Sequence, residues 1–129
     1  MEQIHINATK DSPEINLNSS TNTIDILGVS YPEDTFEFYK PIKVWLTNYF
    51  KGQTDEVTIN IDLSYMNSSS FKVFFEIFEI FEEAYENNTK LTINWIYDED
   101  NDIALEIGED FVDDFSVLNI NLVSKIGVK

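Results

Sequence analysis

Apolar and polar residues alternate in three short segments at the start of the chain. The alternation runs through residues 4–8, 14–18 and 23–27. A period of two places successive side chains on opposite faces of an extended chain, so each segment is predicted to form a half-buried strand. Turn-forming residues around Pro13 and in 18–22 separate the segments. We therefore expect an antiparallel meander at the start of the fold.

The apolar period then lengthens to three or four residues, which is typical of helices. It predicts a first helix over 36–49, in which Pro41 should cause a kink or a restart because proline lacks the backbone N–H. The strongest helical pattern follows Ser70 and runs to about Glu86, and its apolar stripe is too wide for an exposed helix. A weaker helix is predicted over 104–111.

Strand patterns rich in β-branched residues alternate with these helices. Strands are predicted over 57–63 and 90–97, and a last strand over 115–123. A strand, a long helix and a strand in succession form a βαβ unit, whose strands are parallel. The sequence therefore predicts one α/β domain over 1–129, with a mixed sheet in which an antiparallel N-terminal meander is followed by βαβ units.

Charge is the unusual feature of the composition. The 129 residues include 24 acidic residues and eight basic ones, all lysines, for a formal net charge of -16. Nucleic acids and anionic membranes bind clustered Lys and Arg, so neither is expected as a partner. The chain has no cysteine, which excludes disulfides and thiolate metal sites. Because the first residues do not form a signal peptide and no apolar run has the length of a membrane span, a cytoplasmic location is expected.

The run Ser68-Ser69-Ser70 at the start of the predicted central helix is the leading candidate site. One interpretation is helix capping by these serines or by Asn67, which would satisfy free backbone N–H groups. The other is phosphorylation, because a phosphate at this position meets the positive end of the helix dipole. A capping hydroxyl can also be a kinase substrate, and spacing does not decide between the two.

The other residue patterns give weaker evidence for a functional site. Acids at Asp98, Asp100, Asp102 and Glu109 imitate a calcium loop over 98–109, although the position that needs glycine holds isoleucine. The single histidine, the scattered glycines and the adjacent acids form no catalytic or phosphate-cradling motif, so we expect neither an enzyme nor a cofactor.

Several tyrosines are predicted near the ends of elements, where aromatic side chains can contribute to a contact surface. They are Tyr31, Tyr39, Tyr49 and Tyr65.

Three blocks of the sequence together resemble one family. Residues 28–34 with 38–46 are similar to its opening block, 65–72 to its central block, and 95–97 with 106–111 to its closing block. The family is that of the SiaC-type bacterial regulatory phosphoproteins, and the resemblance covers most of residues 1–120. The strand ending at Leu63, followed by a serine at the next helix start, also resembles the arrangement of anti-sigma factor antagonists (STAS domains).

The resemblance implies a partner-switching protein and not a catalyst. A SiaB-like kinase would phosphorylate it and a PP2C-type, SiaA-like phosphatase would reverse the modification. The unmodified form would bind and activate an effector, in known systems the diguanylate cyclase SiaD. The family's acceptor is the hydroxyl residue after Tyr-x-Asn, usually threonine, which here is Ser68, with Ser69 and Ser70 as alternatives. Tyr65, Asn67, Tyr31 and Tyr39 would then join the three serines in the partner-binding surface.

Overall fold

Nine elements follow one another along residues 2–126, the part of the chain that the computed structural model describes. The strands are β1 (Ile4–Ile6), β2 (Glu14–Asn18), β3 (Thr23–Ser30), β4 (Glu56–Met66), β5 (Lys90–Asp98) and β6 (Ile120–Lys125). The helices are α1 (Thr35–Phe50), α2 (Ser68–Glu86) and α3 (Asp102–Asp114). All the predicted elements are present, and their bounds differ from the prediction mainly at the C-terminal end of the chain.

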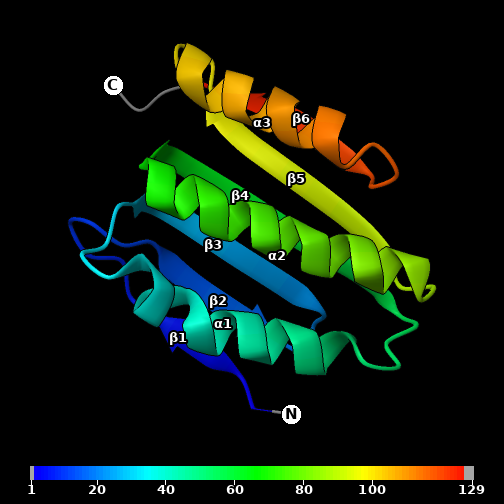
Figure 1. The fold of residues 1–129 in the computed structure, drawn as a ribbon. Coiled ribbons are helices and arrows are strands. Elements are labelled where there is room, and N and C mark those ends of the chain that lie inside the picture. The colour runs from blue at the N-terminus through cyan, green and yellow to red at the C-terminus, as the bar shows by residue number, and fades with distance from the viewer. Residues whose placement is uncertain (1, 127–129) are drawn as a thin grey trace.

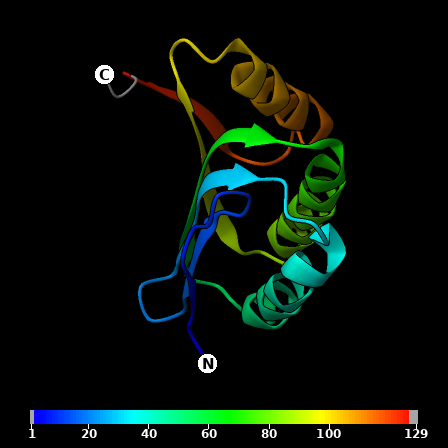
Figure 2. The same ribbon diagram turned by 90° about the vertical axis from the view of Figure 1, so that its left-hand side faces the viewer.

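The six strands form one sheet in the same order as in the sequence, β1-β2-β3-β4-β5-β6. The pairs β1–β2 and β2–β3 are antiparallel, whereas β3–β4, β4–β5 and β5–β6 are parallel. A helix makes each parallel connection, and each connection moves one strand along in the same direction. Connections of one hand that always move in the same direction place their helices on one face. Figures 1 and 2 show this two-layer arrangement, which confirms the predicted mixed sheet.

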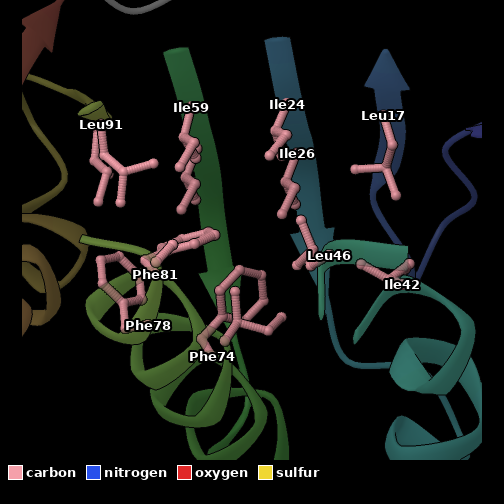
Figure 3. Packing of buried hydrophobic residues seen from close by; sticks show 14 of the residues in the cluster. Leu17, Ile24, Ile26, Ile42, Leu46, Ile59, Phe74, Phe78, Phe81 and Leu91 are labelled. Atoms are coloured by element: carbon pink, nitrogen blue, oxygen red, sulfur yellow. The ribbon is translucent and has the colours of Figure 1, made fainter. Parts of the chain in front are cut away.

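The core lies between the sheet and the three helices. Aliphatic side chains of the strands point toward α1 and α2, which contribute both aliphatic and aromatic residues (Figure 3). Ile26 and Ile59 from the sheet and Phe74, Phe78 and Phe81 from α2 are all fully buried. Because α2 lies over the middle of the sheet, most of its wide apolar stripe is buried, as its sequence predicts.

The structure corrects two expectations about element bounds. Of the kink or restart expected at Pro41, the restart does not occur, because α1 is one continuous helix from Thr35 to Phe50. Pro41 and Glu37, whose carbonyl would have accepted the missing hydrogen bond, are both exposed, so water can replace that bond. The last strand begins at Ile120 and not at 115, because the backbone N–H of Phe115 still donates to Phe111 (2.9 Å) at the end of α3.

The face of the sheet away from the helices carries a row of polar side chains in register. Asn60 donates to Asp25 (2.9 Å), Asn94 donates to Asn60 (2.9 Å), and Asn121 donates to Asn94 (3.3 Å). This row ties β3, β4, β5 and β6 together across the open face. None of the helices within residues 2–126 has the length and apolar character needed to traverse a lipid bilayer.

Candidate functional site

The parallel strands β3, β4 and β5 end at one edge of the sheet, where the helices α1, α2 and α3 begin. We call this the carboxyl edge, and it lies at the left of Figure 1. Chain segments far apart in the sequence meet here because each parallel strand delivers its last residues to the same side. The predicted serine run lies at this edge, at the start of α2.

An irregularity between β3 and β4 shapes the carboxyl edge. Gly28 pairs with Leu63, but the next residue, Val29, pairs with Tyr65, so that Ser64 is an extra residue on β4. Gly28 has a φ of 125°, a conformation that residues with side chains rarely adopt. The extra residue breaks the alternation of β4, and Ser64 and Tyr65 are consecutively exposed. Tyr65 therefore points away from the core.

Tyr65 forms an exposed aromatic pair with Tyr31, which directly follows β3. Their ring centroids are 5.6 Å apart with an interplanar angle of 72°, and the residues are 54% and 41% exposed. The Tyr31 hydroxyl donates to the carbonyl of Lys10 (2.7 Å), and its backbone N–H donates to the carbonyl of Asp11 (2.7 Å). These bonds hold Tyr31 in place, so the pair presents a fixed aromatic surface to solvent, of the kind that is enriched at interfaces.

Asn67 caps α2, and the three serines form its first turn. The Asn67 side-chain oxygen accepts from the backbone N–H of Ser70 (2.9 Å), and its backbone N–H donates to the carbonyl of Ser30 (3.0 Å). The capping interpretation is therefore correct for Asn67 and wrong for the serines. Ser68 and Ser69 are exposed, and among residues 2–126 neither hydroxyl has a hydrogen-bond partner.

Ser70 lies in a buried chain of hydroxyl groups beneath this turn. Its Oγ lies 2.7 Å from the Ser30 Oγ, which lies 2.6 Å from the Tyr39 phenol oxygen. All three residues are 0% exposed. Burial raises the pKa of Tyr39 well above its usual value, although the hydrogen bond with Ser30 opposes this, so the phenol stays neutral and can donate.

Two predicted site residues, Ser70 and Tyr39, are therefore inside the protein and not on its surface. Ser70 points toward the core from the first turn of α2, and Tyr39 packs edge to face against Phe74, with ring centroids 5.4 Å apart. Neither side chain can contact a kinase or another partner in this conformation. Tyr49 is also buried, at the other end of α1, where its hydroxyl donates to Asn22 (2.6 Å). Burial, followed by the negative charge of Asp55, raises the pKa of Tyr49 to about 12.

The alternative of a calcium loop over 98–109 is not supported by the secondary structure of this segment. β5 ends at Asp98 and α3 begins at Asp102, so most of these residues are helical. The Asn101 side chain caps α3 by accepting from the backbone N–H of Ala104 (3.1 Å), and its amide donates to the carbonyl of Ser64 (2.8 Å). Within residues 2–126, no three His, Asp or Glu side chains are arranged to hold a metal ion.

Two exposed apolar residues at the carboxyl edge are not among the predicted site residues. Phe36 and Ile103 are the second residues of α1 and α3 and are 65% and 69% exposed. Both lie in helical segments, where an apolar residue is normally assigned to the core. Phe36 lies three residues before the buried Tyr39 and Ile103 lies four residues before the half-buried Ile107, so the helical spacing of apolar residues gives no signal that separates either of them from the core.

Comparisons with known proteins identify the family to which the chain is similar. A model of the SiaC family of regulatory phosphoproteins matches residues 6–125. An uncharacterized protein of Pseudomonas aeruginosa is 28% identical over 116 residues, which cover 90% of this chain and 92% of that protein.

Solved structures agree with this match. SiaC of Pseudomonas aeruginosa has a TM-score of 0.88 at 25% identity, covering 97% of this chain and 100% of that one. A chain in the crystal structure of the diguanylate cyclase SiaD in complex with its activator SiaC, from the same organism, also has a TM-score of 0.88 at 25% identity. That match covers 95% of this chain and 99% of the other. These matches confirm the predicted resemblance and the α/β fold, and the chain belongs to the SiaC family of regulatory phosphoproteins.

Proposed function

We propose that this protein is a non-enzymatic switch controlled by reversible phosphorylation of Ser68. A SiaB-like kinase adds the phosphate and a PP2C-type, SiaA-like phosphatase removes it. The unmodified form binds and activates an effector, which we propose is a diguanylate cyclase. The pathway would thereby control the level of cyclic di-GMP.

The position of Ser68, in a member of a regulatory phosphoprotein family, is the observation that carries this proposal. Its hydroxyl is exposed and without a hydrogen bond inside residues 2–126, so a kinase can reach it without unfolding the helix. The first backbone N–H groups of a helix have no partner within the helix, and the dipole there favours negative charge. A phosphate on Ser68 is therefore tolerated by the fold itself. Ser69 shares this exposure, whereas Ser70 does not.

The surroundings of Ser68 favour a docking surface. The exposed Tyr31–Tyr65 pair and the exposed side chains of Phe36 and Ile103 lie at the same edge. A partner that covers this edge must also cover Ser68, which contributes a small neutral group when unmodified. Phosphorylation replaces that group with about -1.5 to -2 charges and three acceptor oxygens. Burying this anion without compensation would cost roughly 2–4 kcal/mol of binding free energy, or about 30- to 1000-fold in affinity.

The proposal that the effector is a diguanylate cyclase is based on the known complex of a related protein. SiaC of Pseudomonas aeruginosa has been crystallised as the activator of the diguanylate cyclase SiaD. The match to that complex covers 95% of the present chain and 99% of the other chain. This supports a cyclase as the effector here.

Phosphosite mapping tests the modification. The protein is purified from the cells that encode it, and the peptide containing residues 68–70 is analysed by tandem mass spectrometry. We expect phosphate on Ser68 that disappears after treatment with a PP2C-type phosphatase. The absence of phosphate from Ser68 under every growth condition sampled would contradict the proposal.

A partner-capture experiment tests the switch. Tagged Ser68→Ala and Ser68→Asp variants are expressed in the same cells, and the proteins that copurify are compared. We expect a diguanylate cyclase to copurify with Ser68→Ala. The amount that copurifies with Ser68→Asp should be at least 30-fold lower, because burying a negative charge weakens binding by roughly 2–4 kcal/mol. Ser116→Ala and Ser116→Asp, at an exposed serine between α3 and β6 and away from the carboxyl edge, are the matched controls and should behave alike. Identical partners for both Ser68 variants would indicate a constitutive adaptor instead.

A further inference from the structure

Lys72 lies one helical turn after Ser68 and is the only basic residue of α2. Its side chain is exposed and has no ion pair among residues 2–126. The acid that would normally pair with it is Glu76, four residues later on the same helix. The Oε1 atom of Glu76 instead lies 2.9 Å from the Nζ atom of Lys43 on α1. The Lys72 ammonium is therefore left without a counterion.

We propose that Lys72 is a positioning residue that holds a phosphate on Ser68 against the first turn of α2. Residues four apart on a helix are neighbours, with Cβ atoms about 5–6 Å apart. Long side chains on helices lean toward the N-terminus, which directs the Lys72 side chain toward Ser68. The inference rests on the proposed function, since it concerns the phosphate at the same site.

The charges around Ser68 make Lys72 the main source of attraction from a side chain. The first turn of α2 contains no acid, whereas α1 has Glu37 and α3 has Asp102 in that position. The other charged side chains at the carboxyl edge are mostly acids, which oppose a phosphate there. They are Asp11, Glu33, Asp34, Asp98, Glu99 and Asp100, and the basic ones are Lys10 and Lys125. Lys125 is already paired with Asp62, at 2.5 Å between Nζ and Oδ2.

This pairing would change what a partner meets at the carboxyl edge. In the unmodified protein, the free ammonium of Lys72 can pair with an acidic group of the effector. Once Ser68 carries a phosphate, the same ammonium is occupied within α2. Phosphorylation then removes a favourable contact in addition to introducing an anion.

The test measures the ionisation of the phosphate directly. Phosphoserine is incorporated at position 68 during translation, so that no kinase is needed, and the second phosphate pKa is measured by ³¹P NMR titration. A nearby cation stabilises the dianion and lowers this pKa. We expect Lys72→Gln to raise it by about 0.3, and Lys72→Arg to restore the original value.

The control is Lys90→Gln, an exposed lysine at the other end of α2, where β5 begins. It should leave the phosphate pKa unchanged. An unchanged pKa in Lys72→Gln, or an equal rise in Lys90→Gln, would overturn the inference. Because neither kinase nor effector is present, this result is separate from the partner-capture experiment. Failure of that experiment would refute the switch and leave the Lys72–phosphate pairing standing.

Discussion

At the scale of single residues, the three consecutive serines show that residues of the same type can have different roles. Successive residues on a helix are rotated by about 100°, so adjacent side chains face different surroundings. Ser68 and Ser69 face solvent, while Ser70 faces the core and joins the hydroxyl groups of Ser30 and Tyr39. The buried chain links β3, α1 and α2 directly beneath the proposed phosphorylation site. Ser68 therefore lies on the surface of a helical turn that is held in place by the buried hydrogen bonds of Ser70.

Removing the central hydroxyl tests this anchor. Ser30→Ala leaves the buried hydroxyls of Ser70 and Tyr39 without their shared partner, which should lower the free energy of unfolding by about 1–2 kcal/mol. Urea unfolding followed by tryptophan fluorescence measures this loss. Ser69→Ala, at an exposed position, should change stability by less than about 0.5 kcal/mol. Equal stability of the two variants would show that the chain of hydroxyls does not stabilise the fold.

At the scale of elements, α3 packs unusually close to the sheet. Gly108 is buried in α3, and a Cβ atom there would lie 2.5 Å from Trp95 Cδ1 and 2.8 Å from Leu122 Cδ2. The Trp95 ring also donates from Nε1 to the carbonyl of Ala104 (2.9 Å). The position of α3, and with it Ile103 at the carboxyl edge, therefore depends on the absence of a side chain at residue 108.

Gly108→Ala tests the close approach of α3. Alanine favours helices over glycine by about 1 kcal/mol, but the added methyl group must displace Trp95 or the helix itself. We expect a net loss of about 1–3 kcal/mol in the free energy of unfolding, together with a change in tryptophan fluorescence. Glu109→Ala, on the exposed side of the same helix, is the control. A Gly108→Ala protein as stable as this control would mean that α3 is not held close to the sheet.

At the scale of the whole molecule, negative charge is the dominant feature. The chain carries 24 acidic residues and eight lysines, and residues 2–126 contain two ion pairs, Lys43–Glu76 and Lys125–Asp62. Repulsion among the remaining acids destabilises the folded state, and it also favours partners with basic surfaces. Adding a phosphate increases this charge further, which makes a local cation such as Lys72 more important.

Salt should therefore stabilise the protein at neutral pH. Raising NaCl from about 0.02 M to about 0.5 M shortens the screening length several-fold and should raise the melting temperature by about 5 °C. Calorimetry at pH 7 measures this rise. Near the sequence pI of about 4.1 the net charge approaches zero, so the same step should have little effect. An equal rise at both pH values would indicate a general salt effect and not the screening of repulsion.

The sequence by itself determined the local structure and the family. The period-two and period-3.6 patterns predict every strand and helix because burial of one face imposes that spacing. The cap at Asn67 is also a local feature, since its side chain bonds to a backbone group three residues later. The blocks that resemble the SiaC family extend over most of the chain, and the family match confirms them.

Only the tertiary structure decided which candidate residues are accessible. The apolar stripe gives the rotation of each helix, but it does not say which residues of the first turns are covered by other segments, and the structure buries Ser70 and Tyr39 while exposing Phe36. The pairing of Tyr31 with Tyr65 depends on the extra residue in β4, which arises from contacts with another strand. Glu76 pairs with Lys43, 33 residues away, and so leaves Lys72 free. Each of these features depends on contacts between distant segments, which exist only once the helices have packed on the sheet.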